Sequence, residues 1–258
     1  EIIYNMKRVL LLSLILFLAS CANPNEKVIK INDVKVKMIK VEGGTFTMGD
    51  DYSDYLNDKP AHEVTVSDFW ISETEVTNQL FYAVTGSTIG NFQDESQFQE
   101  PAGISSYYDC IMFIDTLRKV SLLPFDLPTE AQWEYAAKGG NLSKGYKYSG
   151  SDNIDEVGVY INNSPLTTVD VKSLKPNELG IYDMTGNLWE WCKDDYLPYM
   201  DIEETDPLHI GEVPTPKVLR GGGFEDHESR ILVTSRLSEA DFFNFARGVR
   251  LVLPIDAI

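Results

Sequence analysis

The segment Pro176-Asn177-Glu178-Leu179-Gly180-Ile181-Tyr182-Asp183-Met184-Thr185-Gly186-Asn187-Leu188-Trp189-Glu190-Trp191 decides what kind of fold this chain adopts. Its asparagine, aspartate and glycine residues are typical of tight turns, because they tolerate the backbone angles that turns need. Trp189 and Trp191 add large apolar side chains that must be buried close to those turns. From Tyr146 onward no long helical period is present, and clusters of turn residues recur. The C-terminal half is therefore predicted to be rich in loops with short strands.

The N-terminal half carries patterns of regular structure. Val34 to Met48 alternates between apolar and polar residues, which is typical of a strand, and Gly43-Gly44 interrupts it as a hairpin or bulge. The acidic stretch Asp50 to Lys59 is expected to be a loop, and the alternating stretch Glu63 to Ile71 another strand.

Three helices have clear starts, each at a serine or threonine that can cap the first turn. The third also has a glutamine at the position that completes a capping box. They are expected to run from Thr77 to Thr85 before Gly86, from Ser105 or Ser106 to Leu117, and from Thr129, with Gln132, to the stop at Gly139-Gly140. These patterns predict one α+β domain with short antiparallel strands and about three helices.

Six segments stand out, in order, between about residue 38 and residue 253: Val41 to Gly49, Pro60 to Val66 with Glu75 to Asn78, Leu127-Pro128-Thr129-Glu130-Ala131-Gln132-Trp133-Glu134-Tyr135-Ala136, Pro176 to Trp191, Arg220-Gly221-Gly222-Gly223-Phe224, and Gly248-Val249-Arg250. Together they resemble the formylglycine-generating (sulfatase-modifying factor) family. The resemblance implies a C-type-lectin-like fold over residues 34–258, with little regular structure and long ordered loops.

A calcium site is predicted in the opening segment. Asp183 and Glu190, with turn carbonyls between them, offer the carboxylate and backbone oxygens that calcium takes. The resemblance implies that the ion would be held at Asp183, Gly186, Leu188 and Glu190, as a structural cofactor. The alternative is an Asx-turn followed by a solvated glutamate.

The catalytic residues of the family are not found. Its enzymes bind copper(I) through two cysteines, soft thiolate ligands that suit this ion. Aligning the segment after Arg220 places Asp226 and Ile231 at those positions, and His227 at a matching histidine. Asp is a hard ligand and Ile is none, while Cys110 and Cys192 lie elsewhere. We therefore predict no catalytic residue and no copper.

The N-terminus has the order of a secretory signal: Lys7 and Arg8, an apolar run, and small residues before Cys21. Leu18-Ala19-Ser20-Cys21 resembles the bacterial lipobox, which predicts a signal peptide over residues 1–20 and a lipid on Cys21. Residues 21–33 are expected to be the lipidated cysteine and a flexible tether. A plain secretory signal and a retained anchor helix are the alternatives. Residues 1–5 precede the start at Met6 and are expected to be a gene-start artefact.

Charge and cysteine content limit the function further. The formal net charge is −18, and removing residues 1–20 takes away one net positive charge, which leaves −19. Nucleic acid is excluded as a partner, because its phosphates would be repelled, and the membrane would be contacted only through the lipid. Ala22 after Cys21 favours the outer membrane, on its periplasmic or outer side. Cys110 and Cys192 could form a disulfide or stay as two buried thiols.

Three functions fit these observations. The first is a non-catalytic module that binds a protein or glycan ligand through loops held on a rigid scaffold. Its candidate surface is Glu225, Asp226, His227, Arg230, Asp241 and Phe243, although phenylalanines in such a stretch also serve as core. A narrower form of this hypothesis is a lipoprotein diversified by a retroelement, since such proteins use this fold. The second is a formylglycine-generating or other oxidase with altered chemistry, and the third is a structural component of an envelope complex.

Overall fold

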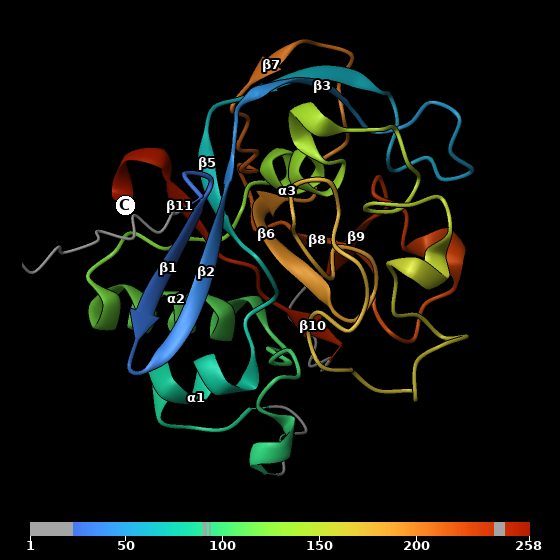
Figure 1. Cartoon of the computed structure of the whole chain (residues 1–258). Helices are drawn as coiled ribbons and strands as arrows, with labels where there is room; N and C mark the ends of the chain where they lie inside the picture. Colours follow the sequence, from blue (N-terminus) through green and yellow to red (C-terminus); the bar gives the residue numbers. More distant parts are fainter. Residues whose placement is uncertain (1–22, 90–91, 93, 240–245) are drawn as a thin grey trace, which may run out of the picture.

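The computed structural model describes residues 23–89, 92, 94–239 and 246–258. In this part of the chain there are three α-helices, five short 3₁₀ segments and three small sheets, joined by long loops (Figure 1). The predicted loop-rich α+β fold with about three helices is thereby confirmed.

The first sheet has four antiparallel strands and lies against the first two helices. Its order is β1 (Glu26–Ile31), β2 (Val34–Val41), β5 (Phe69–Ser72) and β11 (Val252–Pro254). Figure 1 shows the hairpin of β1 and β2 beside α1 and α2, at the lower left of the view. Trp70, Phe81, Phe113 and Leu117 are buried in the core cluster between these layers.

The other two sheets support the loop-rich half. One contains β10 (Arg247–Gly248), β6 (Trp189–Asp195), β8 (Lys217–Arg220) and β9 (Arg236–Glu239), in that order. The other contains β3 (Gly44–Met48), β4 (His62–Val66) and β7 (Glu204–Thr205). The pairs β10–β6 and β4–β7 are parallel, and the remaining pairs are antiparallel.

The helices begin where the sequence predicts. They are α1 (Asn78–Thr85), α2 (Tyr107–Ser121) and α3 (Glu130–Ala137), and the 3₁₀ segments are Glu95–Gln97, Gly140–Leu142, Ile154–Glu156, Glu228–Arg230 and Ile255–Ala257. Thr77, Ser106 and Thr129 accept the capping hydrogen bonds, and Gln132 completes the capping box. α2 runs one turn beyond Leu117, and it is capped at Leu122, whose positive φ lets its N–H bond to the C=O of Arg118. α3 contacts β3, β4, β6 and β8, and so joins the second and third sheets.

The predicted tether is wrong over its second half. Residues 26–31 form β1, which pairs along its whole length with β2. The two strands are joined by Asn32 and Asp33, both with positive φ, which is the backbone of the tightest hairpin turns. The domain therefore begins at Glu26, eight residues before the predicted boundary at residue 34. The sequence signal for this hairpin is the pair Asn32-Asp33 between two alternating stretches. The polar composition of the segment before it favours a tether instead, which is why the hairpin was not predicted.

The predicted strand over residues 63–71 is two strands. β4 ends at Val66 and β5 begins at Phe69, and they belong to different sheets. Ser67 and Asp68 break the alternation between them. The N–H and hydroxyl of Ser67 both donate to the Asp206 carboxylate, a long-range contact that the local pattern does not contain. Within the described ranges, no helix is long and apolar enough to cross a membrane.

Two truncated chains can test whether residues 26–31 are a structural strand or a tether. Removing residues 1–25 is expected to lower the free energy of unfolding by about 1 kcal/mol at most, since it takes away the hydrogen bond from the Lys40 N–H to Asn25. Removing residues 1–33 should lower it by about 2–4 kcal/mol, because Ile31, which is 2% exposed, and the partly buried Ile29 leave the core. Urea unfolding followed by tryptophan fluorescence measures both. Equal midpoints for the two truncated chains would contradict a structural role for β1.

Candidate functional site

The family-like segments meet at a buried ion pair between Arg250 and Glu190. Both residues are fully buried. Arg250 donates from Nη2 to Glu190 Oε1 at 2.7 Å and from Nε to both carboxylate oxygens at 2.9 and 3.0 Å. The indole Nε1 of Trp133 donates to Oε2 at 2.6 Å. Both oxygens of Glu190 are therefore engaged, and one carboxylate ties α3, β6 and the segment before β11 together.

Two further carboxylates lie close to this ion pair. Glu75 accepts hydrogen bonds from Asn187 Nδ2 at 2.9 Å and from the N–H of Leu188 at 3.1 Å. Burial, and then the charges of Asp183 and Glu190, raise the pKa of Glu75 well above its usual value. Burial likewise raises the pKa of Asp183 to about 6. Three buried acidic groups thus share one guanidinium.

The residues predicted to hold calcium, Asp183, Gly186, Leu188 and Glu190, follow one another through this turn. Asp183 and the main-chain carbonyls are oxygen donors of the kind a hard cation needs. Glu190 fits that role only if it gives up hydrogen bonds with Arg250 for the ion. Among the residues that the structure describes, no three His, Cys, Asp or Glu side chains are grouped as metal ligands. The calcium site stays a prediction.

A second buried ion-pair network surrounds Arg220. Its Nε donates to Glu130 Oε1 at 2.9 Å, and its Nη2 donates to Glu134 and to the hydroxyl of Tyr199. Arg236 donates twice to the same Glu130, at 2.7 and 2.8 Å. The characteristic α3 segment therefore supplies the acids, while β8 and β9 supply the arginines. This network fixes where the chain leaves β8 and enters the turn at residues 221–231.

Ile231, at the second copper-ligand position, is a packing residue. It is fully buried among Tyr148, Ile154 and Tyr160. Gly222 has a φ of 79°, and a Cβ there would lie 1.9 Å from Ile231 Cγ2. Only glycine can follow the backbone so close to this side chain. The turn is therefore built around an aliphatic group at this position.

Asp226, at the first copper-ligand position, holds the turn in place. Its Oδ2 accepts a hydrogen bond from Trp189 Nε1 at 2.6 Å and one from the N–H of Gly223 at 3.0 Å. Its Oδ1 lies 3.7 Å from Arg230 Nε. The carboxylate thus serves as an acceptor for the scaffold, a role that the alignment alone could not reveal.

The two cysteines of the described chain are free thiols. Cys110 lies on α2 and Cys192 on β6, in different core clusters, and both are fully buried. Burial raises the pKa of each thiol well above its usual value. Of the two alternatives that the sequence leaves open, the structure has buried thiols.

The structure describes four of the six residues of the predicted ligand surface. Glu225, His227 and Arg230 are exposed on the turn, and Asp226 is half-buried beneath them. Asp241 and Phe243 lie outside the described residues.

A small cavity of about 50 Å³ opens beside this turn. It is lined by Tyr55, Asn57, Trp189, Arg230, Ser235, Arg236 and Leu237. Tyr55 reaches the turn by donating from its hydroxyl to Ser229 Oγ at 3.2 Å. Ser235 Oγ is buried and has no hydrogen-bond partner among the described residues. Tyr55 and Ser235 were not predicted, because the first is 174 residues from its partner in the sequence and the second carries no motif.

Comparison with known proteins identifies the family. Residues 26–255 match the family model described as "Sulfatase-modifying factor enzyme 1-like domain". The chain belongs to this family. The predicted resemblance and fold are therefore confirmed, and the start of the match coincides with the start of β1.

Three relatives illustrate how the family fold is used. Chaperone protein LppX of Paenibacillus barcinonensis is 34% identical over 206 residues, which cover 60% of this chain and 70% of that protein. The formylglycine-generating enzyme of Streptomyces coelicolor is 28% identical over 257 residues, 74% of this chain and 79% of that protein. The structure is also similar to Treponema denticola variable protein 1, with a TM-score of 0.82, 26% identity, and coverage of 90% and 99%.

Calcium binding can be measured directly. Adding calcium is expected to raise the Tm of the wild-type domain over its value with chelator, because an ion that binds only the folded state stabilises it. The Asp183→Ala variant should lose this increment, and an exposed Asp33→Ala variant should keep it. Equal Tm values for the wild type with calcium and with chelator would mean that Arg250 alone neutralises Glu190.

Proposed function

We propose that this domain is a non-catalytic binding module of the cell envelope, which recognises a protein or glycan ligand through the turn at residues 225–230. The observation that carries the proposal is the use of the two copper-ligand positions. Asp226 is engaged by Trp189 and Gly223, and Ile231 is packed against Gly222. Both positions serve the scaffold, so the turn is left to present its exposed side chains.

The exposed part of this turn has the character of a recognition surface. Glu225, His227 and Arg230 place both signs of charge within six residues. Beside them, the cavity lined by Trp189 and Ser235 combines an indole with an unpaired buried hydroxyl. A buried polar atom without a partner costs free energy, which a ligand group reaching into the cavity would recover. Polar groups of this kind on loops held by a rigid scaffold are typical of binding sites.

The name of one relative, a chaperone, favours a protein ligand over a glycan. Another similar protein is named a variable protein. Neither name describes a chemical reaction. A retroelement-diversified form of this domain is a narrower version of the proposal, and its test is genomic: an adjacent template repeat and a reverse transcriptase gene would support it, and their absence would remove it.

An envelope lipoprotein is the setting in which we place the domain. The lipobox-like Leu18 to Cys21 lies outside the described residues, and it is followed after four residues by β1. Outer-membrane location rests on Ala22 alone. If Cys21 is lipidated, the full-length protein expressed in bacteria should partition into the detergent phase of Triton X-114, and Cys21→Ser should move it to the aqueous phase. Equal partitioning of the two would contradict the anchor.

Two other functions remain to be distinguished. The similarity to the Streptomyces enzyme favours residual oxidase chemistry. The purified domain with copper(I) and a sulfatase-motif peptide is expected to form no aldehyde, and aldehyde that disappears in an Asp226→Ala or His227→Ala variant would overturn the proposal. A structural envelope component would instead co-purify with stable partners at equal stoichiometry.

The binding surface itself can be tested by site-specific photocrosslinking. A crosslinker at the exposed position 227 should give a discrete adduct with an envelope component. Arg230→Glu should abolish that adduct by reversing the charge beside the cavity. Lys119→Glu, a charge reversal at an exposed position of α2, should leave it intact. Adducts of equal yield in all three proteins would contradict a role for the turn.

A further inference from the structure

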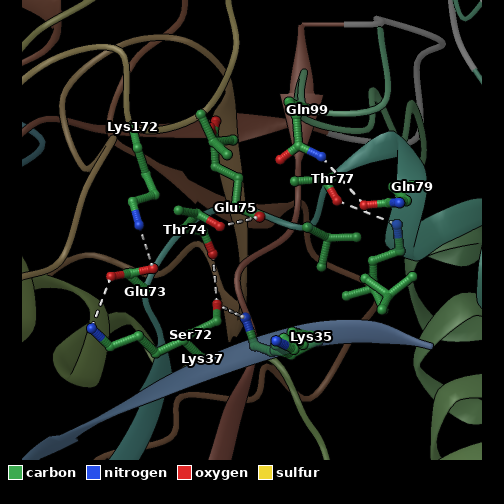
Figure 2. A pocket seen from close by; sticks show the side chains of 16 residues that line it. Lys35, Lys37, Ser72, Glu73, Thr74, Glu75, Thr77, Gln79, Gln99 and Lys172 are labelled. Carbon is green, nitrogen blue, oxygen red and sulfur yellow. Dashed lines mark hydrogen bonds and ion pairs between the residues drawn. The ribbon is translucent and has the colours of Figure 1, made fainter. Parts of the chain in front are cut away.

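A second cavity, of about 220 Å³, lies between β2 and the chain that leads from β5 into α1. Figure 2 shows its lining: Lys37 and Lys172 converge on Glu73 on one side, and Gln79 and Gln99 face each other on the other side. None of its lining residues belongs to the turn at 225–230 or to the cavity beside it. The inference drawn from it does not rest on the function proposed above.

One wall of this cavity is an unpaired strand edge. The N–H of Lys40 donates to the C=O of Asn25, so the main-chain groups of Lys40 point towards the chain of β1. In an antiparallel ladder the main-chain groups of every second residue point to the same side. Those of residues 38, 36 and 34 therefore also point towards β1. Those of Lys35 and Lys37 point the other way. On that side β2 pairs with β5 only over residues 38–41, and Lys37 C=O accepts one more bond from the N–H of Glu73. Among the described residues, none pairs with the N–H and C=O of Lys35.

The edge is free because β5 turns away at its end. Ser72 N–H bonds to Leu251, and Ser72 Oγ donates to the C=O of Thr74 at 2.7 Å, which directs the chain towards α1. The main chain of residues 74–77 therefore diverges from β2 instead of extending the ladder. The space left between the two segments is the cavity.

The charge at this edge is opposite to that of the whole protein. The formal net charge is −18, yet three lysines line the cavity. Lys37 pairs with Glu26 at 2.7 Å and with Glu73 at 3.2 Å, and Lys172 pairs with Glu73 at 2.9 Å. Lys35 is exposed and has no ion-pair partner in the described part of the chain. The other acid, Glu75, already accepts two hydrogen bonds from the turn at 187–188.

The opposite wall offers polar groups that can orient a ligand. Gln99 donates to Gln79 Oε1 at 3.3 Å, which leaves the amide oxygen of Gln99 and the amide nitrogen of Gln79 with bonding capacity towards the cavity. Unpaired strand edges bind extended peptides by adding a strand, and the side chains beside the edge set specificity.

We propose that this cavity binds an extended peptide segment that carries an acidic side chain. The peptide main chain pairs with the N–H and C=O of Lys35 as an added strand. In antiparallel pairing the residue opposite Lys35 has its side chain on the same face, so its carboxylate meets the free ammonium. Gln79 and Gln99 contact the outer side of the bound segment.

The test is an NMR titration of the folded domain with a capped pentapeptide of valine and threonine that has a central glutamate. Amide resonances of Lys35, Lys37 and Gln79 should shift. A peptide with glutamine at the centre should bind about threefold more weakly, since a cross-strand charge pair contributes up to about 1 kcal/mol. A peptide N-methylated at the central residue should not bind.

Variants separate the strand edge from the charge. Lys35→Pro should abolish binding, and it leaves the β1 ladder intact because this N–H points away from β1. Lys35→Gln should weaken binding about threefold, since it removes only the charge pair. Lys27→Glu, an exposed lysine of β1 outside the cavity, is the matched control and should bind as the wild type does.

Two results would overturn the proposal. One is unchanged binding in a Lys35→Pro variant whose spectrum shows the native fold. The other is the same set of shifts on adding succinate, with no competition by peptide, which would make the cavity a site for small carboxylates.

Discussion

The burial of two arginines between glutamates is the constraint on which the structure depends. Arg250 pairs with Glu190, and Arg220 pairs with Glu130 and Glu134, all of them less than 2% exposed. Removing one partner of such a pair leaves a buried charge and costs about 3–5 kcal/mol. The described residues of this domain form three helices and short strands, and these pairs join segments that the sheets and helices leave apart. They explain why acids and arginines recur in the family-like segments.

The residues that hold this scaffold together are different from those at the two copper-ligand positions of the family. The ion pairs hold β6, β8 and the entry to the turn at 221–231 through residues outside the turn. Asp226 and Ile231 add to that support, one through the Trp189 indole and the other through packing on Gly222. A cysteine pair could not replace them without losing both the hydrogen bonds and the buried aliphatic volume. The exposed side chains of the turn take no part in these contacts, so they can change while the core stays the same.

Local signals in the sequence predicted the helices well, and contacts between distant residues could not be predicted. Caps such as Thr129 with Gln132 act within one turn, so the pattern contains the whole cause. β1 was mistaken for a tether because its stability comes from pairing with β2. The bond from Trp189 to Asp226 spans 37 residues, and the alignment identified the positions but not their roles. Both cavities are lined by several separate segments, which no local pattern joins.

The corrected start of the domain shortens the distance between a lipid anchor at Cys21 and the first strand. With the predicted tether, a dozen flexible residues would separate Cys21 from the first strand. β1 begins at Glu26, so five residue steps remain, which span at most about 18 Å when fully extended. A domain anchored this close to a membrane would be repelled by anionic headgroups through its net negative charge. If Cys21 carries a lipid, this short distance would favour ligands in the same membrane over distant soluble ones.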